Sequence, residues 1–305
     1  MAERRLRIAV TGGAGAIGVR VCDELARAGH EVLCLDVKRP AIDVPFREVD
    51  LTQLKLTREA VSGADQIVHL AAIPNPFMGD PPERVIGVNT VLSYNVFEAA
   101  RLEGVRRVVY GCSDSSTGFG IHHVDLVPEY VPIDEDHPLW PHETYSLSKH
   151  FGERIGANYA RAFGLEVLSL RYMWVWLERD RPGVARIVER ARAGTRLEDV
   201  NAKDWLGGHI AVRDVARAVA AAVACTFGSS TEVPFEAFFL SARDTFHTVP
   251  TLSLLEAVFD TPPPVRDPGY FQANPFASVY DIRKAGRLLG WQPAFHWRDF
   301  EAWEL

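Results

Sequence analysis

Cysteine is scarce in this chain of 305 residues, and the four cysteines lie far apart: Cys22, Cys34, Cys112 and Cys225. No Cys-x-x-Cys pair and no Cys/His ligand spacing occurs, so the sequence predicts neither a zinc site nor a disulfide framework. We expect reduced cysteines, which are typical of a cytoplasmic protein.

Long hydrophobic runs are also missing. The most apolar later stretch, 215–223, contains Arg217 and is much shorter than the roughly 20 residues that a membrane-spanning helix needs. Residues 1–11 hold too few apolar side chains for the core of a secretion signal. We therefore expect neither a membrane partner nor secretion.

There is no excess of positive charge. The formal net charge is −7, with 33 basic and 40 acidic side chains, which disfavours a nucleic-acid partner. The hydrophobic fraction of 47% is close to the globular average, so the chain is able to bury a substantial core. Its length fits one large domain, or a large domain with a smaller one attached.

Short apolar strands alternate with helical segments through the first half of the chain. The predicted strands are 6–10, 31–35, 66–71, 107–110 and 166–170. The predicted helices between them are 17–28, 57–62, 85–103 and 145–163. This alternation predicts an α/β fold: a Rossmann-like, doubly wound parallel sheet with helices on both faces.

A glycine-rich turn, TGGAGAIG at 11–18, joins the first strand to the first helix. Gly12 allows a sharp turn, Gly15 lets the backbone approach a pyrophosphate, and Gly18 lets the helix pack closely on the sheet. The free N–H groups at the start of the helix, around Ala16 and Ile17, then stabilise the anion. A tight turn without a ligand is the alternative for this motif alone, but its place in the chain favours a dinucleotide site.

Asp36 ends the second predicted strand, about 20 residues after the glycines. A carboxylate there accepts hydrogen bonds from both hydroxyls of the adenosine ribose and repels a 2′-phosphate, which favours NAD over NADP. Lys38 and Arg39 follow and are able to weaken that repulsion, although a solvated loop is the commoner role for such a pair. We expect NAD as the cofactor.

Tyr145 and Lys149 form a Tyr-x-x-x-Lys pair in a helical segment, so both side chains project from one face. An ammonium near a phenol favours the phenolate, so we expect Lys149 to lower the pKa of Tyr145 from its ordinary value near 10. The lysine is also able to hold the nicotinamide ribose. A surface pair is the alternative for this spacing alone.

Small polar residues follow the strand at 107–110, in the segment GCSDSSTG. Enzymes with parallel sheets place their chemistry at the carboxyl ends of strands, so a serine here is able to bond the substrate oxygen that Tyr145 protonates or deprotonates. We select Ser113, with Ser115 in reserve. A polar turn is the alternative, and a nucleophilic Cys112 is disfavoured because no basic partner is assigned to it.

Beyond Arg171 the alternation loosens, and proline, glycine and aromatic residues become frequent. We predict a cofactor-binding domain over 1–171 that carries the Ser/Tyr/Lys set, and a smaller, mainly substrate-binding lobe over 172–305. A helix within about 208–224 is expected to pack back on the first domain, because its alanines permit close contact.

With TGGAGAIG, Asp36, the segment HLAA at 69–72, Asn89, Ser113 and YSLSK in this order, the chain resembles the extended short-chain dehydrogenase/reductases, the NAD-dependent epimerase/dehydratase family. The similarity is strong to about residue 171. Weaker similarity continues to the segments 208–219 and 281–293.

The resemblance implies further site residues and a partner. It implies that Asp50 and Leu51 flank the adenine and that Asn89 helps to order the central sheet beside the cofactor. It implies proton-relay roles for Ser113, Tyr145 and Lys149. It also implies that the cofactor is lined by Leu70, Ala71 and Ala72. A homodimer is expected through the helices at 85–103 and 145–163.

The segment after the strand at 166–170 departs from many nucleotide-sugar members, which carry an asparagine and a glycine-proline there. Here it reads RYMWVWLERDRPG, with tryptophans instead. Around Ser113 and in WLGGHIAVRDVARAV the chain is weakly similar to uronate dehydrogenases, which oxidise free sugar acids. SDSSTGFG is only a partial match to their serine-asparagine-histidine pattern.

Other polar and aromatic residues have two interpretations each. His122 and His123 lack further ligands at metal-binding spacing, so no metal site is expected, and His209 is interpreted as structural. Three tryptophans are candidates for stacking on a sugar, although buried packing is more common: Trp174, Trp176 and Trp205. Three arginines are candidates for binding a carboxylate or phosphate, although a solvated helix face explains them equally well: Arg179, Arg181 and Arg186.

The combined motifs predict an NAD-dependent oxidoreductase that acts on a hydroxyl of a sugar or nucleotide sugar. If the ketone turns over in the pocket and is reduced on its other face, the result is epimerisation, which we expect. The first alternative is a net dehydrogenase of a free uronic acid or aldose. The second is a catalytically silent, NAD-binding regulatory protein.

Overall fold

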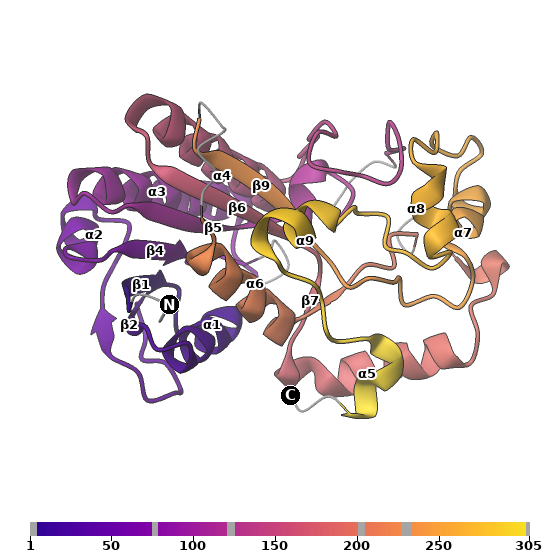
Figure 1. The fold of residues 1–305 in the computed structure, drawn as a ribbon, viewed down its shortest axis with the longest axis horizontal. Coiled ribbons are helices and arrows are strands. Elements are labelled where there is room, and N and C mark those ends of the chain that lie inside the picture. Colours follow the sequence, from indigo (N-terminus) through magenta and orange to yellow (C-terminus); the bar gives the residue numbers. More distant parts are fainter. Residues whose placement is uncertain (1–4, 75–78, 121–125, 201–204, 227–232, 303–305) are drawn as a thin grey trace.

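A seven-stranded, all-parallel sheet forms the centre of the larger part of the molecule, in the strand order β3-β2-β1-β4-β5-β6-β9 (Figure 1). The structure is a computed structural model that describes residues 5–74, 79–120, 126–200, 205–226 and 233–302. The strands are β1 (Arg7–Thr11), β2 (Glu31–Asp36), β3 (Phe46–Glu48), β4 (Gln66–His69), β5 (Arg107–Ser113), β6 (Glu166–Tyr172) and β9 (Phe235–Leu240). The predicted Rossmann-like α/β class is confirmed.

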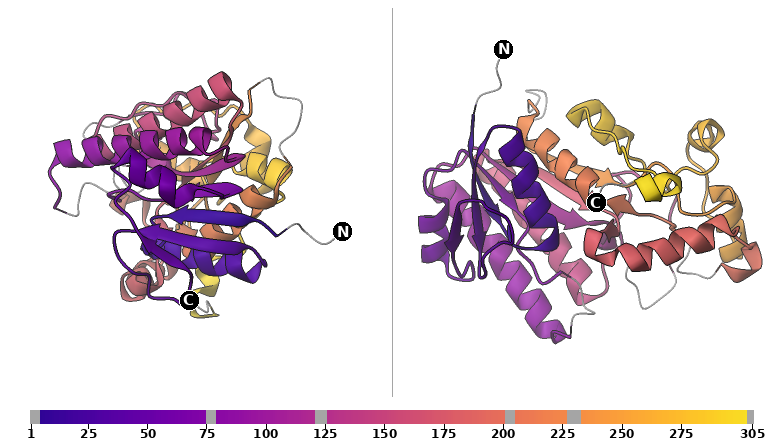
Figure 2. Two further views of the ribbon diagram at one scale, coloured as in Figure 1. Left: turned by 90° about the vertical axis from the view of Figure 1, so that its left-hand side faces the viewer. Right: turned by 90° about the horizontal axis from the view of Figure 1, so that it is seen from below.

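Helices cover both faces of this sheet, as the alternation predicted. On one face lie α2 (Leu54–Val61), α3 (Pro82–Leu102) and α4 (Thr144–Phe163), whose apolar sides share one core cluster. On the other face lie α1 (Ala16–Arg27), α6 (Val212–Ala224) and α9 (Arg283–Leu289). Figure 2 shows the sheet between these two layers.

Two strands of the sheet have no counterpart in the sequence analysis. β3 has only three residues, and two of them are exposed, so it carries little hydrophobic pattern. β9 comes from the second part of the chain and pairs with β6, with Val167 opposite Phe235 and Tyr172 opposite Leu240. Residues after 171 therefore complete the sheet of the first part.

The remaining elements lie beyond the sheet, mostly at the right of Figure 1. A second, two-stranded sheet pairs β7 (Val175–Trp176) with β8 (Ile210–Ala211). The helices are α5 (Arg181–Arg192), α7 (Thr251–Val258) and α8 (Pro268–Ala273). Short 3-10 helices are η1 (Asp114–Thr117), η2 (Glu178–Asp180), η3 (Leu197–Asp199) and η4 (Trp297–Ala302).

The two parts of the chain are joined by buried contacts rather than by a linker. The α6 helix packs on α1, and the carbonyl oxygen of Val223 accepts a hydrogen bond from Gln66 Nε2 at 3.2 Å. Asp214 on α6 accepts hydrogen bonds from the backbone N–H groups of Ala294 and Phe295. The lobe boundary near residue 171 remains a prediction, and the contacts cross it at many places.

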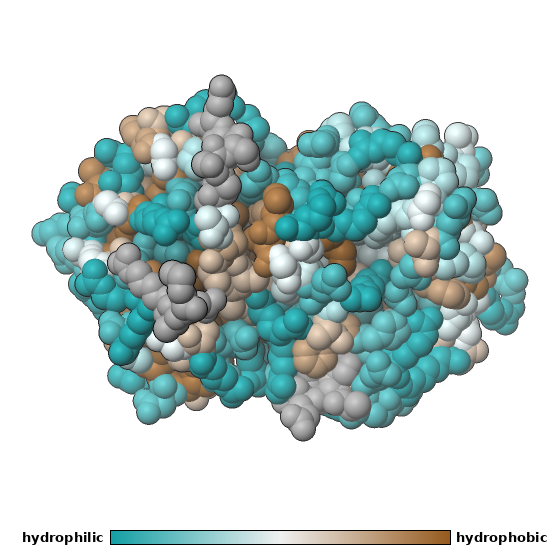
Figure 3. Space-filling view, in the orientation of Figure 1, coloured by the Kyte–Doolittle hydropathy of each residue, from teal (hydrophilic) through white to brown (hydrophobic). Residues whose placement is uncertain are grey.

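The surface is mainly hydrophilic on the face in Figure 3, with hydrophobic residues gathered near the middle. Within the described parts of the chain, no helix is long and apolar enough to cross a membrane.

Candidate active site

The glycine turn after β1 is packed so closely that side chains are excluded at two of its positions. Gly12 has a φ of +68°, and a Cβ atom there would lie 2.6 Å from the backbone nitrogen of Ala71. A Cβ atom on Gly18 would lie 2.1 Å from the carbonyl oxygen of Gly12. The turn thus depends on glycine at both places, as the motif predicted.

Gly15 faces more open space than Gly12 and Gly18. A Cβ atom there would meet only the carbonyl oxygen of Gly12, at 3.1 Å. Gly15 is also the N-cap of α1, and no side chain caps this end of the helix. The free N–H groups of the first turn, including those of Ala16 and Ile17, are therefore available to an anion.

Asp36 lies at the carboxyl end of β2, beside the glycine turn. Its Oδ2 accepts a hydrogen bond from the N–H of Ala14 at 3.0 Å, and its Oδ1 accepts one from Lys38 N at 3.3 Å. The Arg39 guanidinium lies over the Phe46 ring, 5.2 Å from its centroid. The structure thus brings the predicted ribose-binding carboxylate next to the predicted phosphate site.

The residues expected around the adenine differ in accessibility. Asp50 is exposed and accepts bonds from Thr52 and Gln53, which lower the pKa of its carboxyl. Leu51 is only 4% exposed, and its side chain belongs to the core cluster shared by α2, α3 and α4. Its role at the adenine remains a prediction.

The segment after β4 forms another wall beside the turn. Leu70 N donates to the carbonyl oxygen of Thr11, and Ala71 N lies 3.4 Å from the Thr11 hydroxyl. Leu70, Ala71 and Ala72 are half-buried. Their position beside Gly12 agrees with the expected cofactor-lining role, which stays a prediction.

Asn89 on α3 links three parts of the site. Its side chain accepts a hydrogen bond from Ile73 N at 2.8 Å and donates to the Ile73 carbonyl oxygen at 3.1 Å. It also donates to Ser148 Oγ on α4 at 3.0 Å. Asn89 therefore fixes the segment after β4 against the helix that carries Tyr145 and Lys149.

Tyr145 lies in the first turn of α4 because Glu143 caps that helix. The Glu143 carboxylate accepts hydrogen bonds from the N–H groups of Tyr145, at 2.7 Å, and of Ser146. Sequence reasoning missed this cap, because Glu is not among the common N-cap residues. The Tyr145 side chain is 8% exposed.

Lys149 reaches the sheet because two glycines let α4 approach closely. A Cβ atom on Gly152 would lie 2.1 Å from the Tyr110 hydroxyl, and one on Gly156 would lie 2.7 Å from the Phe97 ring. Lys149 Nζ donates to the carbonyl oxygen of Gly111 at 2.8 Å. Its nitrogen lies 5.8 Å from the centroid of the Tyr145 ring.

Ser113 is the last residue of β5 and is 7% exposed. Its hydroxyl donates to Asp114 Oδ1 at 3.2 Å and accepts from Ser115 N at 3.1 Å. The neighbouring Ser113 lowers the pKa of the Tyr145 phenol, although burial raises it more. The Ser115 hydroxyl is buried and has no hydrogen-bond partner among the described residues. Both serines therefore remain candidates for bonding a substrate oxygen.

The sequence analysis predicted a lowered pKa for Tyr145. This prediction is wrong when only the groups of the protein itself act on the phenol. Burial raises the pKa of the phenol well above its ordinary value, and the nearby Asp114 carboxylate raises it further. Burial also lowers the pKa of Lys149, to about 8. The free-energy cost of desolvating a phenolate outweighs the stabilisation from a lysine that is itself buried and bonded to a carbonyl oxygen.

Asp114 is a site residue that the sequence analysis did not select. It is 7% exposed, and burial raises the pKa of its carboxyl to about 7. A Cβ atom on Gly120 would lie 2.7 Å from Asp114 Oδ2, so the chain after η1 closes over this carboxyl. An acidic residue directly after a predicted catalytic serine was the available signal.

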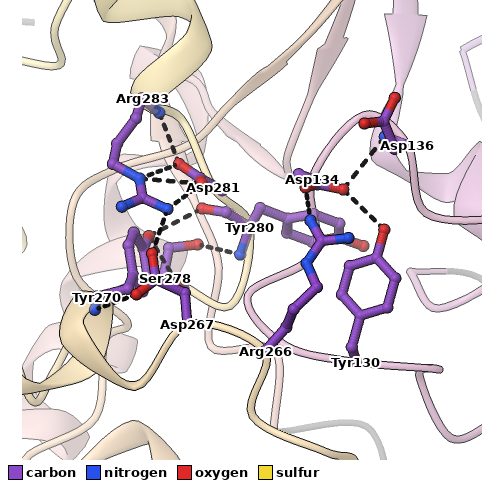
Figure 4. A network of polar contacts seen from close by, with 10 residues as sticks. All are labelled: Tyr130, Asp134, Asp136, Arg266, Asp267, Tyr270, Ser278, Tyr280, Asp281 and Arg283. Carbon is purple, nitrogen blue, oxygen red and sulfur yellow. Dashed lines mark hydrogen bonds and ion pairs between the residues drawn. The ribbon is translucent and has the colours of Figure 1, made fainter.

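The η1 loop is held from the far end of the chain. The hydroxyls of Thr117 and Tyr280 lie 3.0 Å apart. The Tyr280 backbone is fixed in turn, because its oxygen accepts from Tyr270 Oη at 3.1 Å and its nitrogen donates to Ser278 Oγ at 3.3 Å (Figure 4). Distant residues thereby support the serine loop.

Ion pairs on either side of Tyr280 complete this support. Arg266 pairs with Asp134 and lies over the Tyr130 ring, 3.8 Å from its centroid. Arg283 pairs with both Asp267 and Asp281 (Figure 4). We name the ten residues drawn there the Tyr280 network: Tyr130, Asp134, Asp136, Arg266, Asp267, Tyr270, Ser278, Tyr280, Asp281 and Arg283.

The three candidate tryptophans have different environments. Trp205 is 2% exposed and packs edge-on against Phe119 and Phe259. Trp176 is 1% exposed and stacks on His209, with ring centroids 4.1 Å apart. Trp174 is 51% exposed. Of the three, only the exposed ring of Trp174 is placed to meet a ligand.

Trp174 borders a cavity of about 220 Å³ between α5 and the segments at 194–200 and 246–247. Arg190 also lines this cavity, and Arg186 and Arg190 line a second hollow that Trp174 borders too. Arg179 pairs with Asp180, and the Arg181 guanidinium lies over the Phe300 ring. Of the three predicted arginines, Arg186 is thus the one beside the exposed tryptophan.

Of the candidate histidines, the structure describes only His209. His209 is fully buried, and burial lowers its pKa to about 3, which agrees with a structural role. His122 and His123 lie outside the described residues. Within the described ranges, no three His, Cys, Asp or Glu side chains form a group that could hold a metal ion.

This combination of a glycine cradle on β1 with a Ser/Tyr/Lys set on β5 and α4 defines an NAD-dependent α/β enzyme fold. A family model for the NAD dependent epimerase/dehydratase family matches residues 8–232. The chain belongs to this family, as the motifs predicted, and its cofactor is NAD.

Similar proteins with different activities lie within this family. A putative UDP-glucose 4-epimerase of Methanocaldococcus jannaschii is 30% identical over 190 residues, which are 57% of this chain and 58% of that protein. A uronate dehydrogenase of Pseudomonas syringae is 28% identical over 201 residues, 61% of this chain and 69% of that protein. The matched part of the chain thus spans little more than half of the first of these relatives.

Among solved structures, a UDP-galactose 4-epimerase superposes with a TM-score of 0.67 and 26% identity, covering 97% of this chain and 96% of that one. The similarity in fold thus extends beyond residue 171 into the second part of the chain.

The residues present fit NAD. Gly12 and Gly18 shape a turn that a Cβ atom would fill, Gly15 leaves an open approach to uncapped N–H groups, and Asp36 lies beside them. These features are those that a pyrophosphate and an adenosine ribose need.

Proposed function

We propose that the protein uses NAD to oxidise a hydroxyl-bearing carbon of a sugar or nucleotide sugar. The observation that carries this proposal is the buried phenol of Tyr145, with the ammonium nitrogen of Lys149 5.8 Å from the centroid of its ring. A protein that only binds NAD needs the glycine turn and Asp36 but has no use for a buried phenol. The catalytically silent alternative is therefore not favoured.

Each side chain has a separate role in this proposal. Ser113 bonds the substrate oxygen, and Tyr145 takes the proton of that hydroxyl. Lys149, held by the Gly111 carbonyl oxygen, would also donate a hydrogen bond to the nicotinamide ribose. Bound NAD supplies the hydride acceptor for the carbon.

The fate of the ketone separates two activities. An epimerase keeps the ketone bound until hydride returns to its other face, and this is the outcome that we propose first. A net dehydrogenase of a free uronic acid or aldose is the second candidate. It is favoured by the tryptophans after β6 and by the similarity to a uronate dehydrogenase.

The deciding experiment measures NADH absorbance and sugar composition in the same mixtures. The protein is incubated with stoichiometric NAD and glucuronate, L-arabinose or UDP-glucose, and the sugars are then separated by chromatography. A changed sugar without NADH indicates an epimerase, and NADH with an oxidised product indicates a dehydrogenase. If neither signal appears with a wider panel of sugars, the proposed activity is wrong.

We also propose a homodimer through α3 and α4. These two helices pack on each other and carry several exposed hydrophobic side chains: Val91, Tyr94, Leu102, Phe151 and Phe163. Light scattering tests this proposal, and Phe151→Glu is expected to give a monomer. Leu288→Glu, at an exposed position on α9, is the matched control that should leave the mass unchanged.

A further inference from the structure

Two of the four free cysteines meet beneath the glycine turn. Cys22 lies on α1 and Cys34 on β2, and both side chains are fully buried. A Cβ atom on Gly13 would lie 2.6 Å from Cys34 Sγ and 3.2 Å from Cys22 Sγ. Both sulfur atoms therefore lie within 3.2 Å of one point, so the two thiols are neighbours and Gly13 packs on both.

Cys34 belongs to the strand on which the glycine turn rests. Gly12 N donates a hydrogen bond to the carbonyl oxygen of Leu35 at 2.8 Å. Ala14 N donates one to Asp36 Oδ2 at 3.0 Å. The residues that follow Cys34 thus hold the turn on both sides of the glycine that its sulfur touches. A movement of this side chain would reach both the turn and the Asp36 carboxylate.

Cys22 connects the same thiol pair to the start of α1. It follows Gly18 by four residues, so both lie on one face of the helix. Gly18 is in close contact with the turn, since a Cβ atom on it would lie 2.1 Å from the carbonyl oxygen of Gly12. The uncapped N–H groups that are free for an anion belong to the turn of α1 that precedes Cys22. The thiol pair therefore joins the two elements that the motif assigns to NAD.

We propose that Cys22 and Cys34 form a reversible disulfide that weakens NAD binding, with a peroxide as the oxidant. The Cys34 sulfur attacks one oxygen of hydrogen peroxide, the O–O bond breaks, and water leaves. The Cys22 sulfur then displaces the oxygen of the resulting sulfenic acid, so that the S–S bond forms and a second water leaves. The two thiols lose two electrons and two protons, and one peroxide becomes two waters. An external thiol restores both cysteines by exchange.

The two sulfur atoms have different parts in this reaction. The nucleophile of a cysteine is its thiolate. The neighbouring Cys22 lowers the pKa of the Cys34 thiol, whereas the neighbouring Cys34 raises the pKa of the Cys22 thiol. Cys34 is therefore the sulfur that attacks the peroxide, and Cys22 is the one that completes the disulfide.

Formation of the bond requires both sulfur atoms to move. An S–S bond is about 2.05 Å long, which is much shorter than a contact between two free thiols. Both side chains are fully enclosed and both touch Gly13. Because a protein interior is close-packed, a movement of enclosed atoms passes to the groups that touch them. The oxidised protein thus has a displaced glycine turn, and NAD binds the reduced protein better.

NAD and the disulfide therefore oppose each other. Since neither thiol is exposed, peroxide reaches them only when the turn opens, and bound NAD keeps the turn closed. Linkage makes the effect mutual, because NAD favours the reduced pair by the same factor by which the disulfide weakens NAD binding. We expect this factor to be about ten or more.

The first test follows the bond itself. The full-length protein is treated with hydrogen peroxide, with and without saturating NAD, and disulfides are identified by mass spectrometry of its peptides. We expect a link between Cys22 and Cys34 that dithiothreitol reverses and that forms about tenfold more slowly with NAD. If this link is absent, or if NAD leaves its rate unchanged, the proposal is wrong.

The second test measures NAD binding by calorimetry before oxidation, after it, and after reduction with dithiothreitol. The Kd for NAD is expected to rise about tenfold on oxidation and to return on reduction. Saturating NAD should also raise the reduction potential of the pair by about 30 mV, which is a tenfold change for a two-electron couple. A disulfide that forms and leaves the Kd unchanged would overturn the proposal.

Two variants and a control show which cysteines are responsible. Cys22→Ser and Cys34→Ser should each bind NAD as the reduced wild type does, and peroxide should no longer change their Kd. Circular dichroism checks their folding, and either variant alone is sufficient if the other fails to fold. Cys225→Ser is the matched control, because Cys225 is only partly buried and should not contribute to the response. A tenfold peroxide effect that persists in a folded Cys22→Ser or Cys34→Ser variant would assign the response to other residues.

These tests use NAD and peroxide without any sugar. Their outcome is therefore independent of the proposed function, which the NADH and chromatography assays decide separately.

Discussion

The turn after β1 and the segment after β6 both lie at the carboxyl ends of strands in one sheet, but different physical factors determine them. The turn needs glycines because backbone atoms approach one another, and this need appears directly in the sequence. The segment after β6 depends on side chains that meet distant residues, such as Trp176 on His209 and Phe246. The glycine turn and the Ser/Tyr/Lys set, which we call the cofactor half, can therefore be predicted from local sequence. The part of the site after β6, which we call the substrate half, depends on contacts that only the folded chain makes.

Tyr145→Phe removes the reactive group of the cofactor half and should have the largest effect. Removal of the phenolic oxygen takes away the group that receives the substrate proton, so kcat should fall by about 1,000-fold or more. NAD affinity should change little, because the ring and Lys149 remain. NADH formation and calorimetric NAD titration measure the two effects, and full activity in the variant would refute the assignment of Tyr145.

Gly18→Ala disturbs the backbone of the glycine turn in the cofactor half. The added Cβ would lie 2.1 Å from the Gly12 carbonyl oxygen, so the turn must move and NAD binding should be lost. We expect a loss of about 1–3 kcal/mol in unfolding free energy. Gly87→Ala on α3 is the matched control, because nothing lies within 4 Å of its added Cβ. Equal NAD affinity in both variants would show that the tight turn is unnecessary.

Asp36→Ser tests the choice between cofactors within the same half. Without the carboxylate, a 2′-phosphate is no longer repelled, and the ratio of kcat/KM for NAD to that for NADP should fall about tenfold or more. A ratio that stays at its wild-type value would mean that Lys38 and Arg39 already determine the preference.

His209→Phe tests the packing of the substrate half through pH. The pKa of His209 is lowered to about 3 by burial, below the ordinary value near 6.5. The unfolded chain therefore takes up a proton below about pH 6.5 that the native protein does not, and the unfolding free energy falls toward pH 3. The variant keeps an aromatic ring against Trp176. Near pH 5, its unfolding free energy should fall by about 1.4 kcal/mol less per pH unit than that of the wild type. Denaturant titrations at several pH values measure the slope, and identical slopes would contradict the buried neutral histidine.

Trp174→Ala should have the smallest effect on stability and act mainly on substrate. Since Trp174 is 51% exposed, its removal should change the unfolding free energy by about 0.5 kcal/mol or less and raise KM for the sugar. Trp205→Ala is the contrast, because this buried ring should cost about 3–5 kcal/mol. A Trp174→Ala variant with unchanged KM would place the substrate elsewhere.

Much of the fold followed from the alternation of strands and helices, and the predicted helix boundaries lie within a few residues of those observed. Local sequence patterns were also enough to select candidate site residues: the glycine turn, Asp36, Ser113, Tyr145 and Lys149. β9 was missed because the aromatic run FEAFFL carries Glu236 and lies far along the chain from its partner β6.

The pKa of Tyr145 could not be predicted from the spacing to Lys149. Spacing gives the neighbour, but the direction of the shift depends on how much water the fold removes from both groups. The sequence shows that Asp114 follows Ser113. Its burial, and hence its proton affinity near neutral pH, depends on Gly120 and on packing that only the folded chain provides.

The bond between Tyr280 and Thr117 also has a consequence during synthesis on the ribosome. The glycine turn, Asp36 and the helix with Tyr145 are complete early, whereas the residue that holds the serine loop is translated more than a hundred residues after Lys149. A nascent chain is therefore expected to acquire its cofactor site well before its serine loop is fixed. Activity would then begin only in chains whose final segment has folded back onto the first.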